Sequence, residues 1–409
     1  MKKTLLLLLL IPSFIFAQSG MVFEHGMTWK EILAKAKTEN KYIFMDAFTT
    51  WCGPCKMMAA NIFPLENVGS FFNKNFINVK VQLDTSKEDN DNVKKWYADA
   101  HMIMTDYKVN VFPTYLFLSP DGKLVHRAIG SSPADVFIAK GKDALDPDKQ
   151  YYVMLDKYKA GNRDPEFMRR VAIAADAAYD KSVAKTISQE YLKTQKDLFT
   201  KENIAFIDRF TNSSRDDGFA FIMNNGEKYD AVMGAGAAAN KLSGIIKQTE
   251  LYPILFSRNA VAPDWAALNS QLSTKYPKLA PEIISSTKVI YFQSKQDWNG
   301  FQSAVQDYMK VYGAKASPEE LNMYAWTVFE NCKDMTCVTD ALEWSKRSFK
   351  DRENPAFMDT YANILYKLGK KEEAIKWEEK ALSLVAEGDK KTYTETLDKM
   401  KKGEKTWKE

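Results

Sequence analysis

The stretch TTWCGPCKMM, residues 49–58, decides the fold expected for the N-terminal part of the chain. Cys52 and Cys55 stand three positions apart, with Gly53 and Pro54 between them. On a helix, residues at this spacing have Cα atoms about 5 Å apart, inside the usual disulfide range of about 4.4–6.8 Å. A pair at the start of a helix can therefore open and close with little backbone movement. Pro54 suits the first turn, where an amide hydrogen has no helical partner.

Three kinds of site use this spacing: a metal site, a structural disulfide and a redox pair. A zinc site needs about four ligands, and the histidines of the chain, His25, His101 and His126, are not at metal spacing. A four-cysteine metal site that also used Cys332 and Cys337 would have to join distant segments of the chain. We therefore expect no metal. A thiolate is favoured at a helix N-terminus, which supports the redox pair, while a structural disulfide remains the alternative.

Helix and strand patterns alternate on both sides of the pair. The apolar spacing and the Pro-Asp-Gly turn predict a helix over 28–40, a buried strand over 41–48, a helix after Cys52, a strand over 75–84, a strand–turn–strand unit over 111–130 and a closing helix over 132–145.

Two separated motifs in this region match one known family. The first, MDAFTTWCGPCK, places Asp46 six residues before Cys52 and Trp51 directly before it. The second, YKVNVFPTYLFLSPDGKLVHRAIG, places Pro113 before a strand, a turn and Gly130. Residues 25–145 therefore resemble the thioredoxin family, which implies an α/β thioredoxin fold.

The resemblance implies a role for each matching residue. Cys52, expected to be the more exposed cysteine, attacks a substrate disulfide as a thiolate, and Cys55 resolves the mixed disulfide. Asp46, buried beneath the pair, accepts or returns the proton, and Pro113, in the cis form, presents the preceding backbone to an extended substrate. The residues expected to support the site or bind substrate are Trp51, Gly53, Pro54, Lys80, Phe112 and Thr114.

A finer resemblance is to the thioredoxin-like domains of secreted disulfide reductases. They share the opening helix with its tryptophan and the segment MMAANIFPLENVGSFFNKNFINVKVQLD. The segment between Asp84 and Tyr107 is longer than in thioredoxin itself, which changes the expected substrate groove on that side.

The length of 409 residues predicts two to three domains. After the thioredoxin-like region, the sequence pattern predicts helices. From about residue 150 the apolar residues recur at helical spacing, which predicts an all-helical domain over 150–318. Over 319–405, ALEWSKRS and AIKWEEKA match 33 residues apart. This last part resembles tetratricopeptide repeats, which are helical hairpins of about 34 residues.

The first residues predict export. Two lysines precede an apolar run from Leu5 to Ala17, which is too short to span a bilayer. Residues 1–17 are therefore predicted to be a signal peptide, and the mature protein to be periplasmic or secreted, with no membrane span. The net charge of +4 is small, and no dense basic block with interleaved aromatic residues supports nucleic-acid binding.

A second cysteine pair, Cys332 and Cys337, stands five positions apart. On a continuous helix their Cα atoms would be about 8.7 Å apart, beyond the limit of about 7 Å for a disulfide. Comparison of the two repeats places four extra residues in the turn of the first hairpin, where CKDMTC falls. We expect a structural disulfide that closes this enlarged turn, with a second redox relay and free thiols as the alternatives.

The sequence thus predicts a thioredoxin-like domain over 20–146 followed by helical domains. The expected function is that of an exported thiol–disulfide oxidoreductase that reduces protein disulfides, with the Cys52–Cys55 disulfide as its redox centre and no other cofactor. Its expected partners are exported proteins with disulfides and a membrane-bound electron donor. The alternative is a helical-repeat interaction module whose thioredoxin-like domain mainly binds partners.

Overall fold

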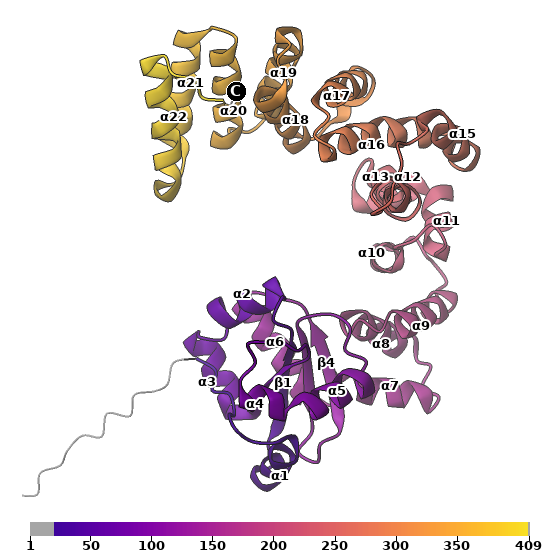
Figure 1. Ribbon diagram of the computed structural model, residues 1–409. Helices are drawn as coiled ribbons and strands as arrows, with labels where there is room; N and C mark the ends of the chain where they lie inside the picture. The colour runs from indigo at the N-terminus through magenta and orange to yellow at the C-terminus, as the bar shows by residue number, and fades with distance from the viewer. Residues whose placement is uncertain (1–19, 408–409) are drawn as a thin grey trace, which may run out of the picture. The chain divides into compact units, whose positions relative to one another are not determined.

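The computed structural model describes residues 20–407, so the predicted signal peptide lies outside the described residues. The chain divides into two compact units, the first ending at Phe206 and the second beginning at Ile207. Figure 1 shows the elements of each unit, from the indigo N-terminal part to the yellow C-terminal helices.

The first unit holds all the strands found among residues 20–407. Its elements are α1 (Trp29–Glu39), β1 (Tyr42–Phe48), α2 (Gly53–Asn61), α3 (Glu66–Asn75), β2 (Phe76–Gln82), α4 (Asp91–Lys95), α5 (Tyr97–Asp106), β3 (Thr114–Leu118), β4 (Leu124–Ile129), α6 (Ala134–Leu145), α7 (Tyr151–Lys159), α8 (Pro165–Ala177) and α9 (Lys181–Lys193). Each helix and strand predicted before residue 146 is confirmed, and the thioredoxin fold with it.

The four strands form one sheet in the order β2-β1-β3-β4. Strand β1 pairs parallel with β2 and antiparallel with β3, and β3 pairs antiparallel with β4. Successive side chains of a strand point to opposite faces. Met45 therefore joins the core beneath α1 and α5, while its neighbour Phe44 joins the core beneath α2, α3 and α6. Burial on both faces explains why β1 reads as a continuous apolar run.

Helices after the thioredoxin-like region also cover the sheet. Helix α7 packs against β4, and α8 packs against α7. The backbone N–H of Tyr151, at the start of α7, donates a hydrogen bond of 3.1 Å to Nδ1 of the buried His126 on β4. The first compact unit continues to Phe206, and within it α7 covers β4.

The contact between His126 and Tyr151 predicts a pH-dependent stability. Burial lowers the pKa of His126 to about 4, whereas the imidazole titrates near pH 6.5 in the unfolded chain. Below pH 6.5 the imidazole is protonated in the unfolded state but stays neutral in the folded state. The stability that the neutral ring provides is therefore lost as the pH falls toward 4. Between pH 7.5 and 5 this loss amounts to about 2 kcal/mol.

The check compares the wild type with His126→Gln, whose amide oxygen can still accept the Tyr151 N–H but does not titrate. Urea unfolding of both proteins at pH 7.5 and pH 5 gives the difference in free energy of unfolding, and groups other than His126 cancel in that difference. We expect the wild type to lose about 2 kcal/mol relative to the variant. A difference that does not change with pH would contradict this role.

After α9, every element in the described part of the chain is a helix. They are α10 (Lys201–Phe210), α11 (Asp217–Asn224), α12 (Gly226–Met233), α13 (Ala237–Ile246), the π-helix η1 (Lys247–Leu251), α14 (Tyr252–Leu255), α15 (Trp265–Lys275), α16 (Ala280–Ser294), α17 (Trp298–Tyr312), η2 (Gly313–Lys315), α18 (Pro318–Asn331), α19 (Met335–Ser348), α20 (Pro355–Lys367), α21 (Lys371–Leu384), η3 (Glu387–Asp389) and α22 (Lys390–Lys402). Helices α18 and α19 form one hairpin and α20 and α21 the next, as the repeat predicts. Among residues 20–407, no helix combines the length and the apolar composition needed to cross a bilayer.

The structure corrects the prediction for the second cysteine pair. Cys332 and Cys337 are free, buried thiols, and the Cys337 thiol lies 3.7 Å from the Cys332 sulfur. This distance is nearly twice the S–S bond length of about 2.05 Å. The helix does break between them, but the turn is not enlarged. Cys332 ends α18, and Asp334 caps α19 by accepting a hydrogen bond from the Thr336 N–H. Cys337 therefore lies in the first turn of α19, and no disulfide closes the connection.

Candidate functional site

Three connections meet at one edge of the sheet. The residues after β1 lead into the cysteine pair, and the residues after β2 leave the same edge because the two strands are parallel. Strand β3 is antiparallel to β1, and its first residue, Thr114, pairs with Ala47 near the end of β1. Pro113 therefore enters the sheet beside the exit toward Cys52. The crevice at such a strand edge is a common position for sites in α/β folds.

The cysteines form a disulfide across the first turn of α2. Their Cα atoms are 5.3 Å apart, close to the predicted distance. Cys52 is the N-cap of α2, and its Sγ accepts a hydrogen bond of 3.1 Å from the Cys55 N–H. Pro54 occupies the first turn, as expected. When the disulfide opens, the sulfur at the N-cap is in a position to hold negative charge, because a helix N-terminus carries partial positive charge.

The expected difference in exposure between the two cysteines is wrong for this disulfide form. Cys52 is 3% exposed and Cys55 is 5% exposed. Burial therefore does not distinguish the attacking sulfur from the resolving one. The distinction comes from position in α2, because only Cys52 precedes the helix and accepts the N–H of its first turn.

Aromatic side chains join the cysteine loop to the proline loop. Trp51 is 69% exposed, and its ring meets the Phe112 ring edge to face, with centroids 5.7 Å apart. The Phe112–Pro113 peptide bond is cis, as predicted. The Pro113 carbonyl accepts a hydrogen bond of 2.9 Å from the Gly130 N–H, and the Thr114 hydroxyl donates one of 2.7 Å to the Val111 carbonyl. These contacts fix both loops beside the disulfide and leave Trp51 accessible to a substrate.

Asp46 is a buried acid in β1. The residue is 2% exposed, and its Oδ1 has no hydrogen-bond partner among residues 20–407. Burial raises the pKa of Asp46 to about 7, although the positive charge of Lys80 lowers it in part. Lys80 lies opposite Asp46 on β2, with its Nζ 4.0 Å from the Asp46 Oδ2. A carboxyl group with this pKa can accept and release a proton near neutral pH.

Three aromatic rings surround the ammonium group of Lys80, in addition to the Asp46 carboxylate. Its Nζ lies 5.0 Å from the centroid of the Phe48 ring and 5.6 Å and 5.7 Å from those of Phe23 and Phe63. Attraction between an ammonium group and aromatic faces stabilises the cation at this place. The structure therefore brings together the predicted pair of Asp46 and Lys80.

Asp84 is a residue of the site that the sequence did not single out. Its carboxylate accepts hydrogen bonds of 2.9 and 3.1 Å from the Thr50 N–H and a further one from the Thr50 hydroxyl. Thr50 lies two residues before Cys52, and the Cys52 N–H donates to the Thr49 carbonyl at 3.2 Å. Asp84 thus fixes the turn that carries the disulfide. An acid two residues after a buried strand, at the edge where the cysteine loop lies, is the signal that could have identified it.

The segment between Asp84 and Tyr107 is connected to the same loop through Asp84. It contains α4 and α5, and Asp89 anchors it by accepting hydrogen bonds from the Ser86 N–H at 2.7 Å and from the Tyr97 hydroxyl at 2.7 Å. The Gln82 side chain donates to Asp89 at 2.9 Å and to the Asp84 carbonyl at 3.0 Å. The Gln82 and Asp89 side chains therefore link this segment to Asp84, which fixes Thr50.

The other residues predicted for the site are all found at this edge, except the second cysteine pair. Gly53 and Pro54 begin α2, and Phe112, Pro113 and Thr114 begin β3 or precede it. Within the described part of the chain, no three His, Cys, Asp or Glu side chains gather in a group that could hold a metal ion.

Known proteins share this part of the chain. A family model described as a thioredoxin-like domain matches residues 29–145. Thioredoxin H-type 2 of Nicotiana tabacum is 31% identical over 103 residues, which are 25% of this chain and 71% of that protein. Thioredoxin-2 of Pyricularia oryzae is 29% identical over 109 residues, which are 27% of this chain and 53% of that protein.

Solved structures of the same kind are similar to this part of the chain. The solution structure of a thioredoxin from Thermus thermophilus is 20% identical, covers 32% of this chain and 89% of its own, and has a TM-score of 0.26. The residues that the family model matches lie within the first compact unit.

Proposed function

The chain belongs to the thioredoxin family and is a thiol–disulfide oxidoreductase, and we propose that it reduces the disulfides of other proteins outside the cytoplasm. The observation that carries the proposal is the Cys52–Cys55 disulfide across the first turn of α2, with Cys52 as the N-cap. Asp46, with a pKa of about 7, supplies a proton acceptor in the strand that leads to this pair.

The exchange balances as two substitutions at sulfur. The Cys52 thiolate attacks one sulfur of the client disulfide, the client S–S bond breaks, and one client cysteine leaves as a thiolate. Cys55 loses its proton toward Asp46 and attacks the Cys52 sulfur. The Cys52–Cys55 bond forms and the second client thiolate leaves. The client gains two electrons, and the oxidised pair needs two electrons from a donor before the next cycle.

The residues between the cysteines favour reduction over oxidation. A couple is a strong oxidant when its reduced, thiolate form is stabilised. Gly53 and Pro54 add no charged or hydrogen-bonding side chain near Cys52, so the Cys52 thiolate depends on the helix terminus and the Cys55 N–H. The buried Asp46, when ionised, disfavours a second negative charge nearby. Both features keep the thiolate form from becoming very stable.

Export and the electron donor are parts of the same proposal. Lys2 and Lys3 followed by the apolar run from Leu5 to Ala17 support secretion. Disulfides persist in the compartments that such signals lead to, so client disulfides are present there. A reductase in that environment needs electrons from outside it, and a membrane-bound donor would supply them.

Two measurements test the proposal. The reduction potential of the Cys52–Cys55 couple, obtained by equilibration with thiol buffers, should lie near that of thioredoxin, about −270 mV, rather than near the value of about −120 mV for a strong oxidant. The reduced protein should also turn over a generic client such as insulin. A potential above about −180 mV would reject the reductase assignment. A protein that binds disulfide clients without turnover would support the interaction module instead.

A further inference from the structure

The second unit holds a cavity of about 1070 Å³, slightly larger than the usual range of about 300–1000 Å³ for ligand sites. Three segments line it, namely residues 213–215 after α10, residues 249–254 in η1 and α14, and residues 268–276 in and after α15. All of them belong to the unit that begins at Ile207, so the cavity is separate from the cysteine site.

Arg215 determines the net charge of the residues that line the cavity. Glu250 accepts hydrogen bonds of 2.9 Å from the Lys275 Nζ and 2.6 Å from the Tyr276 hydroxyl. Burial raises the pKa of Glu250, but these bonds and one from Ser214 outweigh burial and lower that pKa. Glu250 and Lys275 thus neutralise one another. The guanidinium group of Arg215 is exposed, and no carboxylate within residues 20–407 pairs with it.

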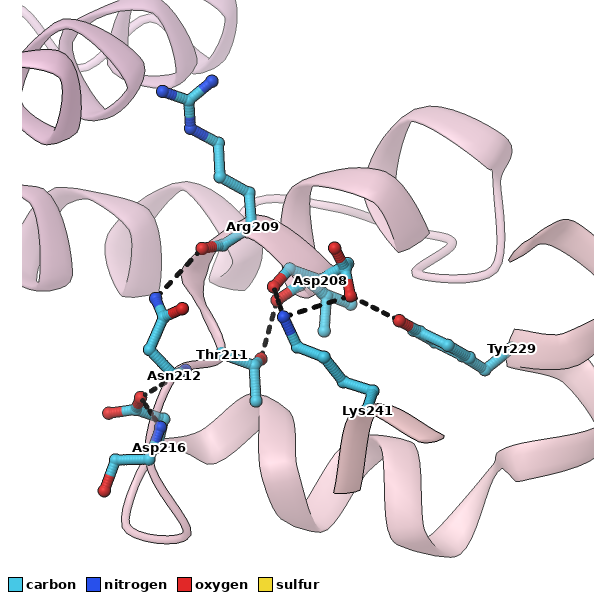
Figure 2. Close-up of polar contacts among 9 residues, drawn as sticks. Asp208, Arg209, Thr211, Asn212, Asp216, Tyr229 and Lys241 are labelled. Carbon is cyan, nitrogen blue, oxygen red and sulfur yellow. Dashed lines mark hydrogen bonds and ion pairs between the residues drawn. The ribbon is translucent and has the colours of Figure 1, made fainter. Parts of the chain in front are cut away.

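The loop that carries Arg215 is fixed in place. The Asp216 carboxylate accepts hydrogen bonds of 3.0 Å from the Asn212 N–H and 2.9 Å from the Ser213 N–H. The Asn212 side chain donates to the Arg209 carbonyl at 3.1 Å, so the loop is tied back to the end of α10 (Figure 2). The Arg215 N–H itself donates to the Ser213 hydroxyl at 3.2 Å. Because the backbone of this loop is already ordered, binding there costs little backbone entropy.

The end of α10 is itself anchored to two other helices. Lys241 of α13 donates to the Asp208 carbonyl at 2.8 Å and lies 3.2 Å from the Asp208 Oδ1 (Figure 2). The Tyr229 hydroxyl of α12 donates to the same carboxylate. The Arg215 loop therefore extends from a rigid junction of three helices.

The opposite wall contributes apolar surface and an irregular helix. At the end of η1, the backbone N–H of Tyr252 donates to the carbonyl of Lys247, five residues earlier. The next residue, Pro253, has no N–H. Such π-helical turns occur frequently at functional sites. The lining includes the buried Leu272 and Ile254, which is 54% exposed. An exposed isoleucine at a charged cavity suits a ligand that has both an acidic and an aliphatic group.

A second cavity, of about 450 Å³, adjoins the first, because Lys275 and Tyr276 line both. Its lining is mostly apolar and includes Ile222, Leu242 and Leu279. A charged cavity beside an apolar one can hold two side chains of different character from one ligand.

We propose that these two cavities bind an acidic peptide segment of another protein in extended form. A carboxylate of the segment meets Arg215 in a charge-assisted, bidentate hydrogen bond, and an aliphatic side chain of the segment contacts Ile254. The next aliphatic side chain enters the adjoining apolar cavity. A small free anion would leave the apolar walls uncovered, which is why the structure favours a peptide. This binding role goes beyond disulfide exchange and does not depend on it.

The test uses the full-length protein and a fluorescein-labelled octapeptide of alternating leucine and glutamate. Fluorescence anisotropy should show saturable binding, and a peptide with glutamine in place of glutamate should bind at least about tenfold more weakly. Arg215→Ala should weaken binding of the glutamate peptide by about tenfold or more, and Arg215→Lys by less, because lysine keeps the charge but loses the bidentate fork. The matched control is Arg258→Ala, an exposed arginine of the same unit outside both linings, which should leave binding unchanged.

Several results would overturn the proposal. They are an absence of saturable binding, equal binding of the glutamine peptide, equal losses in Arg215→Ala and Arg258→Ala, and full displacement of the peptide by millimolar inorganic phosphate, which would indicate a site for small anions. Circular dichroism of each variant checks that it is folded, so that a loss of binding can be assigned to the changed side chain.

Discussion

Replacing Cys52 by serine is expected to abolish disulfide exchange, with a loss of about 10³-fold or more in insulin reduction. The sulfur of Cys52 is the N-cap of α2 and accepts the Cys55 N–H at 3.1 Å. It is therefore the sulfur that the helix terminus can stabilise as a thiolate, and a serine hydroxyl at this position cannot attack a disulfide. The measurement is the initial rate of insulin reduction with dithiothreitol as the electron source.

Replacing Cys55 by serine is expected to give a different product. Cys52 can still attack, but no second thiol resolves the mixed disulfide, so covalent complexes with client proteins accumulate on non-reducing gels. The double variant Cys332→Ser with Cys337→Ser is the control and should exchange at the wild-type rate, because both thiols are buried in the second unit. Equal trapping by Cys52→Ser would contradict this assignment of the attacking and resolving cysteines.

Replacing Asp46 by asparagine is expected to change stability in a pH-dependent way. The pKa of Asp46 is raised to about 7 by burial, while an aspartate in the unfolded chain titrates near 3.9. The stability associated with the protonated acid is fully present below about pH 4 and is lost as the pH rises through 7. Relative to Asp46→Asn, the wild type should lose about 2–4 kcal/mol between pH 4 and pH 8. Urea unfolding of the oxidised forms at several pH values measures this difference.

The same substitution is expected to slow exchange. Asparagine cannot accept the proton of Cys55, so the resolution step should slow by about 100-fold, the lower range for loss of a general base. The dependence of the rate on pH near 7 should disappear with it. Lys80→Gln provides the companion variant, because removal of the cation 4.0 Å away should raise the pKa of Asp46 further. An unchanged pH–rate profile in Asp46→Asn would leave Asp46 a structural residue only.

Local sequence patterns were sufficient to predict most of the first unit. The apolar run of β1, the cysteine spacing and the proline before β3 are each determined by short-range rules, and each was found where expected. The burial of Asp46 was implied by the resemblance to the thioredoxin family, and the strand that holds it is buried. The repeat spacing predicted the hairpins of α18–α21 in the same way.

Features that depend on contacts between distant segments could not be predicted. The bond between Asp84 and Thr50 joins residues 34 positions apart, and no periodicity reports it. The turn at Cys332 was misjudged because the extra residues between the matched alanines lie within the helices, mainly in the first turn of α19, which begins at Met335. The cavity beside Arg215 arises from the packing of helices far apart in the sequence.

The hydrogen bond between His126 and Tyr151 has a consequence for how this protein can be divided and recombined. The match to the thioredoxin family ends at residue 145, but the helix that covers β4 begins at Tyr151. A gene fusion or domain exchange made at the family boundary would expose an imidazole and an apolar strand to solvent. A junction after Phe210, at the end of α10, keeps this cover and the contact between Tyr191 of α9 and Asn203 of α10, and is the natural place to graft the redox module onto another protein.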